Sequence, residues 1–387
     1  MSATILYINT PSYLGGAEIS LLSLMRNLDP MRYHPVLVTT GEGQLTDASR
    51  AHGIETVIQQ FPPFRKRFPW RYPLSVLRLA NTAHRHRAAL VHANCPNAAR
   101  HTVAASHLAP RPYIAHVRDA RDAWSRPSSI RFLRTSHCVI VNSHAVGHHL
   151  AELGVSHSLT RVVYNPVEVI DYADPDRAVA RRRIREELGI QEAVLLVGIV
   201  GQVQEIKGHT DLVQAAPSIL ARLPSTHFLV AGAAFDDAAR HYEQQVRSLI
   251  CELDLDDHFH LIGFRSDVGD VMQALDVLVV PSWQEAFGRV VVEGMAAGCP
   301  VVGANVGGIP EIIEDGTNGL LVQPHDPNGI ADAVVRLAKT DHLRQRMVDC
   351  GYATAAKFSV SAHVDQVEAI YDSLLFQRGA HANPDLP

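Results

Sequence analysis

The sequence predicts an α/β protein built from two doubly wound domains, each a parallel sheet wrapped by helices. Three observations lead to this prediction. The chain has 387 residues, enough for two domains of roughly 100 to 200 residues each. Hydrophobic residues make up 47% of it and charged residues 19%, which excludes an intrinsically disordered chain. Short apolar runs also alternate with segments of helical period along most of the sequence.

The alternation falls into two halves. Apolar runs predict strands at residues 5–9, 34–40, 89–94, 112–117, 138–143 and 161–166 in the first half, and at 194–200, 227–232, 259–264, 276–282 and 300–305 in the second. A charged stretch at 171–189 separates the halves. We therefore expect an N-terminal domain over 1–168 and a C-terminal domain over 169–358. Residues 378–387 are expected to form a frayed tail.

The composition also indicates the cellular compartment of the protein. No apolar run approaches the roughly 18 residues of a membrane span, and the first residues lack the positive start and the cleavage site of a signal peptide. The five cysteines are far apart and show no zinc-site spacing, which fits a reducing compartment. We expect a cytoplasmic protein that needs no metal and no cofactor and does not bind nucleic acid.

The net charge of −5 hides an uneven distribution. Between Phe61 and Arg134 there are 14 lysines and arginines and two acids, a local charge of +12. Residues 61–73 within this stretch contain four prolines, which exclude a regular helix. They interleave aromatic rings with basic side chains, among them Arg65, Lys66, Arg67, Trp70 and Arg71. This pattern predicts a loop that approaches an anionic membrane surface or acceptor; an ordinary surface loop is the alternative.

The most informative stretch is PSWQEAFGRVVVEGMAAGCPVV at 281–302. A buried strand is expected to end at Pro281, while Gly298 followed by Pro300 is typical of a helix end. The intervening helix should therefore begin near Phe287 or Gly288.

The expected bounds of this strand and helix fix the positions of two glutamates. Glu285 should lie ahead of the helix, at the carboxyl edge of the sheet, where open α/β sheets bind ligands. Glu293 should lie about two turns into the helix, so both carboxylates can face one crevice. The alternative is an unrelated surface acid and helix-face acid.

Two glycine-containing segments also follow predicted strands. Gly201 comes directly after one strand, and Lys207 lies just ahead of a helix, where positive charge can stabilise a diphosphate leaving group; a solvated lysine is the alternative. Gly15 and Gly16 follow the first strand and open a helix, either as backbone that faces a ligand or as a helix-capping turn. They do not form G-x-G-x-x-G, which speaks against a dinucleotide dehydrogenase.

The spacing of the two glutamates within EAFGRVVVEGMAAG resembles the family 4 retaining glycosyltransferases with the GT-B fold. GGAE at 15–18, the histidine of IAHVRD, YNP at 164–166, KG at 207–208, GFRSDV from 263 and GGIPEII from 307 follow the family's order. The resemblance implies two Rossmann-like domains that face each other across a crevice. The N-terminal domain would bind the acceptor and the C-terminal domain the nucleotide sugar, with the final helix, 359–377, crossing back to the N-terminal domain.

The resemblance also implies roles for single residues. His116, Lys207 and Glu285 would be catalytic, with His116 and Glu285 at the transferred sugar; a satisfied core histidine is the alternative for His116. Glu293 would accept hydrogen bonds from the ribose hydroxyls. The other expected donor contacts are Gly15, Gly16, Gln202, Lys207, Arg265, Phe287, Gly288 and Arg289. Asn165 and Glu311 are weaker candidates that could instead be turn or cap residues.

One position departs from the family pattern. Gln202 stands where these enzymes usually have an arginine that clamps the diphosphate together with the lysine. Gln202 can donate hydrogen bonds but brings no charge. Either Arg289 or Arg265 would compensate, or donor binding would be weaker.

The implied activity is retaining transfer of a hexosyl-type unit from a UDP-sugar, or a GDP-sugar, to an acceptor hydroxyl. The acceptor would be a glycan, a lipid-linked molecule or a small molecule, met in the cytoplasm or at the inner membrane face. Without a carboxylate nucleophile in evidence, the acceptor would attack from the face that the leaving group departs, with no metal required. A nucleotide-sugar 2-epimerase and a non-catalytic nucleotide-sugar binder are the alternatives.

Overall fold

The computed structural model of the chain describes residues 2–10, 12–62, 70–118, 126–168 and 177–376. It divides into two compact units. Unit 1 contains Met1–Pro166 and Val360–Pro387, and unit 2 contains Val167–Ser359. The two ends of unit 2 meet, because Val167 and Ser359 form a parallel bridge and the Val167 N–H donates to the Phe358 carbonyl at 2.9 Å. The tail expected at 378–387 lies outside the described residues.

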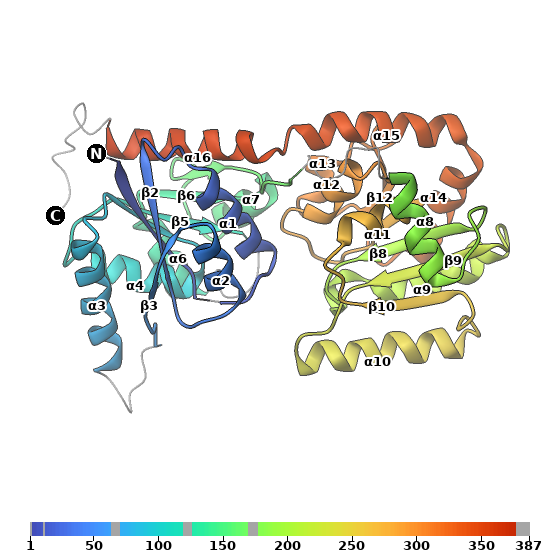
Figure 1. The fold of residues 1–387 in the computed structure, drawn as a ribbon, viewed down its shortest axis with the longest axis horizontal. Coiled ribbons are helices and arrows are strands. Elements are labelled where there is room, and N and C mark those ends of the chain that lie inside the picture. The colour runs from blue at the N-terminus through green and yellow to red at the C-terminus, as the bar shows by residue number, and fades with distance from the viewer. Residues whose placement is uncertain (1, 11, 63–69, 119–125, 169–176, 377–387) are drawn as a thin grey trace. The chain divides into compact units, whose positions relative to one another are not determined.

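Unit 1, which Figure 1 draws from blue to green with α16 in red, is built on a parallel sheet. This sheet has seven strands in the order β3-β2-β1-β4-β5-β6-β7. Its strands are β1 (Ala3–Ile8), β2 (Tyr33–Thr39), β3 (Glu55–Ile58), β4 (Leu90–Ala93), β5 (Tyr113–Val117), β6 (Cys138–Val141) and β7 (Thr160–Val162). Its helices are α1 (Gly16–Asn27), α2 (Gln44–Ala51), α3 (Arg71–Arg85), α4 (Pro96–Ser106), α6 (Pro127–Arg134), α7 (His144–Glu152) and α16 (Val360–Leu375).

The C-terminal helix α16 is part of unit 1. It packs against α1 and places Val364, Val367 and Tyr371 in the core of this unit. Polar contacts hold it as well, since the Asp29 N–H donates to the Glu368 carboxylate at 2.8 Å and the Tyr33 hydroxyl donates to Asp372 at 2.6 Å. A segment at the end of the sequence thus stabilises the sheet at its beginning.

Unit 2 is built on a six-stranded parallel sheet with the order β10-β9-β8-β11-β12-β13. Its strands are β8 (Leu195–Val200), β9 (Thr226–Ala231), β10 (Phe259–Gly263), β11 (Val277–Val280), β12 (Val301–Ala304) and β13 (Leu320–Val322). Its helical segments are α8 (Arg177–Leu188), η2 (Glu205–Lys207), α9 (His209–Leu220), α10 (Asp237–Glu252), α11 (Val268–Ala274), α12 (Arg289–Ala296), α13 (Ile309–Ile312), α14 (Pro327–Lys339) and α15 (Asp341–Ala356).

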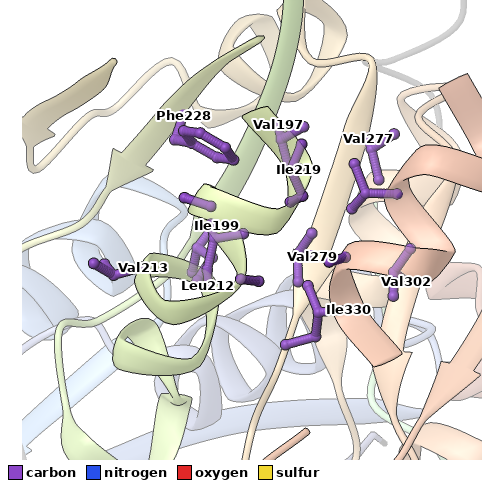
Figure 2. Packing of buried hydrophobic residues seen from close by; sticks show 14 of the residues in the cluster. Val197, Ile199, Leu212, Val213, Ile219, Phe228, Val277, Val279, Val302 and Ile330 are labelled. Atoms are coloured by element: carbon purple, nitrogen blue, oxygen red, sulfur yellow. The ribbon is translucent and has the colours of Figure 1, made fainter. Parts of the chain in front are cut away.

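The core of unit 2 follows from strands that are buried on both faces. Val197 and Ile199 of β8 and Phe228 of β9 point to the same side of the sheet, where they meet Leu212 of α9 and Ile330 of α14 (Figure 2). Residues next to them on these strands, such as Leu196 and Leu229, are also buried, and they point to the other face because side chains alternate along a strand. The near-continuous apolar runs in the sequence are therefore typical of parallel strands covered by helices on both sides.

Each sheet has a point where the chain reverses its direction of strand addition. This point lies between β1 and β4 in unit 1 and between β8 and β11 in unit 2. Ligands of open α/β sheets bind outside the carboxyl ends of the strands at such switch points. The predicted fold class, two doubly wound α/β domains, is confirmed, and the topology points to one candidate site in each unit.

Candidate active site

The switch point of unit 2 brings two of the predicted residues together. Lys207 ends the 3-10 turn η2 that follows β8, and Glu285 lies in the loop that follows β11. The Lys207 Nζ donates to Glu285 Oε2 at 2.6 Å, and the two side chains are 28% and 14% exposed. The ion pair is therefore formed at the strand ends and stays open to solvent on one side, so a polar ligand can reach both groups.

The helix after β11 begins slightly later than expected. Gly288 is the N-cap with φ of +100°, a conformation that favours glycine, and α12 runs from Arg289 to Ala296. Glu293 consequently lies just beyond the first turn, and the expected position about two turns into the helix is wrong. The end is as predicted, since Gly298 follows the last helical turn with φ of +70°.

Glu293 forms an ion pair on its own helix. Arg289 Nη2 donates to Glu293 Oε1 at 2.7 Å and Arg289 Nε donates to the same oxygen at 3.1 Å. Both side chains are about one fifth exposed. A ligand that binds here can therefore meet an acceptor and a donor that already orient each other.

Neighbouring segments hold the Glu285 loop in place. The Gly308 N–H, from the GGIPEII motif, donates to the Glu285 carbonyl at 3.2 Å. The ring of Phe287 is buried and packs edge-on against Phe358, with ring centroids 5.4 Å apart. Phe287 can therefore offer a ligand only its backbone. Glu311 lies in the first turn of α13.

Gln202 and Arg265, the other donor-binding candidates of this unit, differ in position. Gln202 is the second residue after β8 and is partly exposed. Arg265 follows β10, two strands away from β8 in the sheet, and donates to Glu187 and Asp267. Its charge is balanced by these two carboxylates, so Arg265 is poorly placed to replace the arginine that Gln202 lacks. Arg289 is the better-placed candidate, because its helix α12 follows β11, the strand that pairs with β8.

His116 is completely buried on β5 in unit 1. Its Nδ1 lies 3.0 Å from His92 Nε2, and His92 Nδ1 lies 2.7 Å from the Tyr371 hydroxyl of α16. Burial holds the pKa of His116 well below its usual value, so the ring is neutral. The ring is closed off from any ligand in this conformation, but it differs from the satisfied core histidine of the alternative, because its buried Nε2 has no hydrogen-bond partner among the described residues. A role at the sugar stays a prediction that requires the ring to become exposed.

The switch point of unit 1 carries polar residues that sequence reasoning did not assign. Asn9, Asn94 and Arg118 come directly after β1, β4 and β5, and all are buried. The Arg118 Nε donates to Asn94 Oδ1 at 2.9 Å, and Asn94 Nδ2 donates to Asn9 Oδ1 at 3.0 Å. Arg118 also donates to Asn165. Their shared position after an apolar run was the available signal.

Gly15 takes the capping role that was the alternative to ligand binding. It is the N-cap of α1, which begins at Gly16. The Gly15 N–H donates to the carboxylate of Glu18 at 3.2 Å, and Asn9 Nδ2 donates to the other oxygen of this carboxylate at 3.4 Å. The GGAE motif therefore ties the first turn of α1 to the strand-end cluster. Contact of Gly15 or Gly16 with a donor stays a prediction.

The basic segment at 61–73 is described only in part, since Arg65, Lys66 and Arg67 lie outside the described residues. Trp70 and Arg71 are exposed at the start of α3, and this helix includes Pro73 in its first turn. The expectation that the prolines exclude a regular helix is therefore wrong for the end of the segment, because a first turn tolerates proline. Among the described residues, no group of three or more histidine, cysteine, aspartate or glutamate side chains could hold a metal ion. Metal independence stays a prediction.

Comparison with known proteins gives matches along most of the chain. The model of Glycosyltransferase Family 4 matches residues 14–170, and that of Glycosyl transferases group 1 matches residues 180–354. The D-inositol 3-phosphate glycosyltransferase of Corynebacterium jeikeium is 34% identical over 215 residues, which is 55% of this chain and 51% of the relative. Its Thermobifida fusca counterpart is 33% identical over 58% of this chain and 52% of the relative. The chain thus spans about half the length of these relatives.

Solved structures match over nearly the whole chain. HepE of Anabaena in complex with UDP has a TM-score of 0.85 and 25% identity, over 96% of this chain and 100% of that one. The same protein with UDP-glucose has a TM-score of 0.84. Sucrose-phosphate synthase from Thermosynechococcus elongatus has a TM-score of 0.79 at 21% identity, over 96% of this chain and 99% of that one, and so shares the fold.

Proposed function

We propose, from the premise that this chain belongs to the family 4 glycosyltransferases with the GT-B fold, that it transfers a hexosyl-type unit from a nucleoside diphosphate sugar to an acceptor hydroxyl. The observation that carries the proposal is the Lys207–Glu285 pair, 2.6 Å apart at the switch point of unit 2. UDP is the favoured nucleotide, because HepE, with 25% identity, was solved with UDP and with UDP-glucose.

Each residue of unit 2 has a distinct part in this proposal. Lys207 and the backbone N–H groups at the start of α12 stabilise the charge that develops on the departing diphosphate. Glu285 contacts the transferred sugar, and Glu293 accepts hydrogen bonds from the ribose hydroxyls. Gln202 adds neutral hydrogen bonds to the diphosphate, and unit 1 binds the acceptor.

The stereochemistry we propose is retention. The acceptor hydroxyl attacks the anomeric carbon from the face that the diphosphate leaves, and the departing phosphate oxygen takes the acceptor proton. The C–O bond to the diphosphate breaks as the new glycosidic bond forms, so no covalent enzyme intermediate is needed. The rate enhancement comes from alignment of the acceptor with the donor and from stabilisation of the charge on the diphosphate.

We expect the purified chain to release the nucleoside diphosphate, UDP or GDP, from one member of a panel of UDP-sugars and GDP-mannose when an acceptor hydroxyl is present. NMR should show the same anomeric configuration in the product as in the donor. The rate should be the same in excess chelator, because Lys207 supplies the positive charge that a metal ion would otherwise provide to the diphosphate. Loss of activity in chelator with recovery in Mg²⁺ or Mn²⁺ would contradict the metal-independent mechanism. Conversion of the nucleotide sugar to its 2-epimer without acceptor would favour the epimerase, and binding without turnover the non-catalytic binder.

We also propose that the protein works in the cytoplasm at the inner membrane face. Helix α3 carries no acidic residue, and Trp70, Leu74 and Leu77, which recur at helical spacing, are 59%, 43% and 55% exposed. Arg71, Arg78 and Arg85 add positive charge on the same helix. Within the described residues, no helix is long and apolar enough to cross a bilayer. An anionic surface complements both features of α3, because basic groups meet headgroups while the apolar side chains enter the interface.

Vesicle co-sedimentation tests this association. The chain should bind anionic vesicles at low salt and dissociate at high salt, because each basic group contributes roughly 1 kcal/mol that salt screens. Replacing Arg71, Arg78 and Arg85 by serine should weaken binding strongly, whereas the same change at Arg240, Arg247 and Arg344 of unit 2 should not. Equal binding to neutral vesicles would contradict the role of the basic side chains, and no binding to anionic vesicles at low salt would identify α3 as an ordinary surface helix.

A further inference from the structure

Trp283 joins the two loops that carry Lys207 and Glu285. Its backbone N–H donates to the Ile206 carbonyl at 2.8 Å. Its indole Nε1 donates to Asp211 Oδ2, on the first turn of α9, at 2.9 Å. The loop after β11 is therefore bonded to both sides of Lys207 in the sequence.

The two loops touch at the backbone as well. Gly208 adopts the left-handed conformation with φ of +67°, and a Cβ at this position would lie 2.1 Å from the Pro281 carbonyl oxygen and 3.1 Å from the Trp283 Nε1. Only glycine allows this approach. A small displacement of Trp283 is thus transmitted directly to the residue next to Lys207.

The indole is fixed on its other side. Its ring packs on His325, with ring centroids 4.2 Å apart. Asp211 is 4% exposed. A buried carboxylate is costly unless it is hydrogen-bonded, so the indole N–H and Asp211 stabilise each other. The proposed contacts with the donor use neither of them.

We propose that Trp283 and Asp211 are positioning residues that hold Lys207 against Glu285 in the geometry required for transfer. This inference rests on the proposed function, since it assumes that Lys207 acts on the diphosphate. Because a misplacement of about 1 Å can cost about a hundredfold in rate, loss of the indole–carboxylate bond should lower kcat. The affinity for UDP should change little, since Glu293 lies outside the bonded loops.

Two series of variants test the proposal. Trp283→Phe keeps an aromatic ring beside His325 but removes the N–H, and Asp211→Ala removes the acceptor; each should lower kcat about 10- to 100-fold with the Kd for UDP within about threefold. Asp211→Asn keeps an acceptor oxygen and should retain kcat within about threefold. His325→Ala, the matched control for ring packing, should do the same.

A double-mutant cycle shows whether Trp283 acts through Lys207. In a Lys207→Ala background, Trp283→Phe should cost less than about a further twofold in kcat, because its target is gone. An equal loss in both backgrounds, or kcat within twofold of wild type for both Trp283→Phe and Asp211→Ala, would overturn the proposal. If Lys207→Ala itself is without effect in an active enzyme, the proposed function of Lys207 fails instead.

A readout without turnover keeps the inference testable even if no acceptor is found. The chain has only four lysines, and Lys339 and Lys357 are exposed. Acetylation followed by mass spectrometry should modify Lys207 at least fivefold more slowly than Lys339 in the wild type. Trp283→Phe and Asp211→Ala should remove this protection, while Asp211→Asn keeps it. Unchanged protection in the first two variants would show that the ion pair forms without Trp283 and Asp211.

Discussion

Lys207→Ala is expected to lower the rate of sugar transfer about 10²- to 10³-fold, the usual cost of removing one group that stabilises developing negative charge. The charge on the diphosphate is greatest in the transition state, so kcat should fall more than donor affinity. Stability should change little, because the Lys207–Glu285 pair is partly exposed and such pairs contribute roughly 1 kcal/mol or less. Steady-state kinetics and urea unfolding of the same samples measure both effects.

Two control variants separate the effect of the Lys207 charge from the effect of its ion pair with Glu285. Glu285→Gln removes the negative charge beside Lys207 but keeps the lysine. It should change the rate of transfer and the KM for the donor sugar, but it should not reproduce the effect of Lys207→Ala on the affinity for UDP. Lys339→Ala removes an exposed lysine at the end of α14 and should leave all parameters unchanged. Turnover within a few-fold of wild type in Lys207→Ala would show that the diphosphate is stabilised elsewhere.

The sequence predicted the strand-end positions better than the contacts made there. Apolar runs located eleven of the strands to within a few residues, but they missed β3 and β13, which lie at the edges of the two sheets. The helix after β11 was predicted one or two residues early. Its start depends on the left-handed conformation of Gly288, and a glycine in sequence does not reveal which φ it adopts.

Contacts between distant segments could not be predicted. The hydrogen bond from Trp283 to Asp211 joins residues that are 72 positions apart. From the sequence alone, Trp283 is only an apolar residue that follows a strand. The burial of His116 could not be predicted either: its ring lies beside those of His92 and His363, and His92 in turn contacts the Tyr371 hydroxyl of α16. The packing of α16, more than 240 residues later, decides this.

Glu293→Ala is expected to weaken donor binding by roughly 2 to 4 kcal/mol, which corresponds to a Kd about 30- to 1000-fold higher. Ribose hydroxyls that donate to a carboxylate would lose a charged acceptor and remain desolvated. The same variant removes the carboxylate that pairs with Arg289, so a displaced guanidinium can contribute to the change. Titration calorimetry with UDP measures the affinity, and circular dichroism checks that the fold is intact.

A matched ion pair and a modified ligand isolate the ribose contribution. Glu243 pairs with Arg247 at 2.7 Å on α10 with the same four-residue spacing, so Glu243→Ala removes an equivalent helix pair and should leave the Kd for UDP unchanged. Loss of the ribose contacts should also make Glu293→Ala and the wild type bind 2′,3′-dideoxy-UDP with similar, weak affinity, because that ligand has no hydroxyls to donate. If Glu293→Ala weakens both ligands equally, the carboxylate acts through Arg289 and the diphosphate, and its assignment to the ribose is wrong.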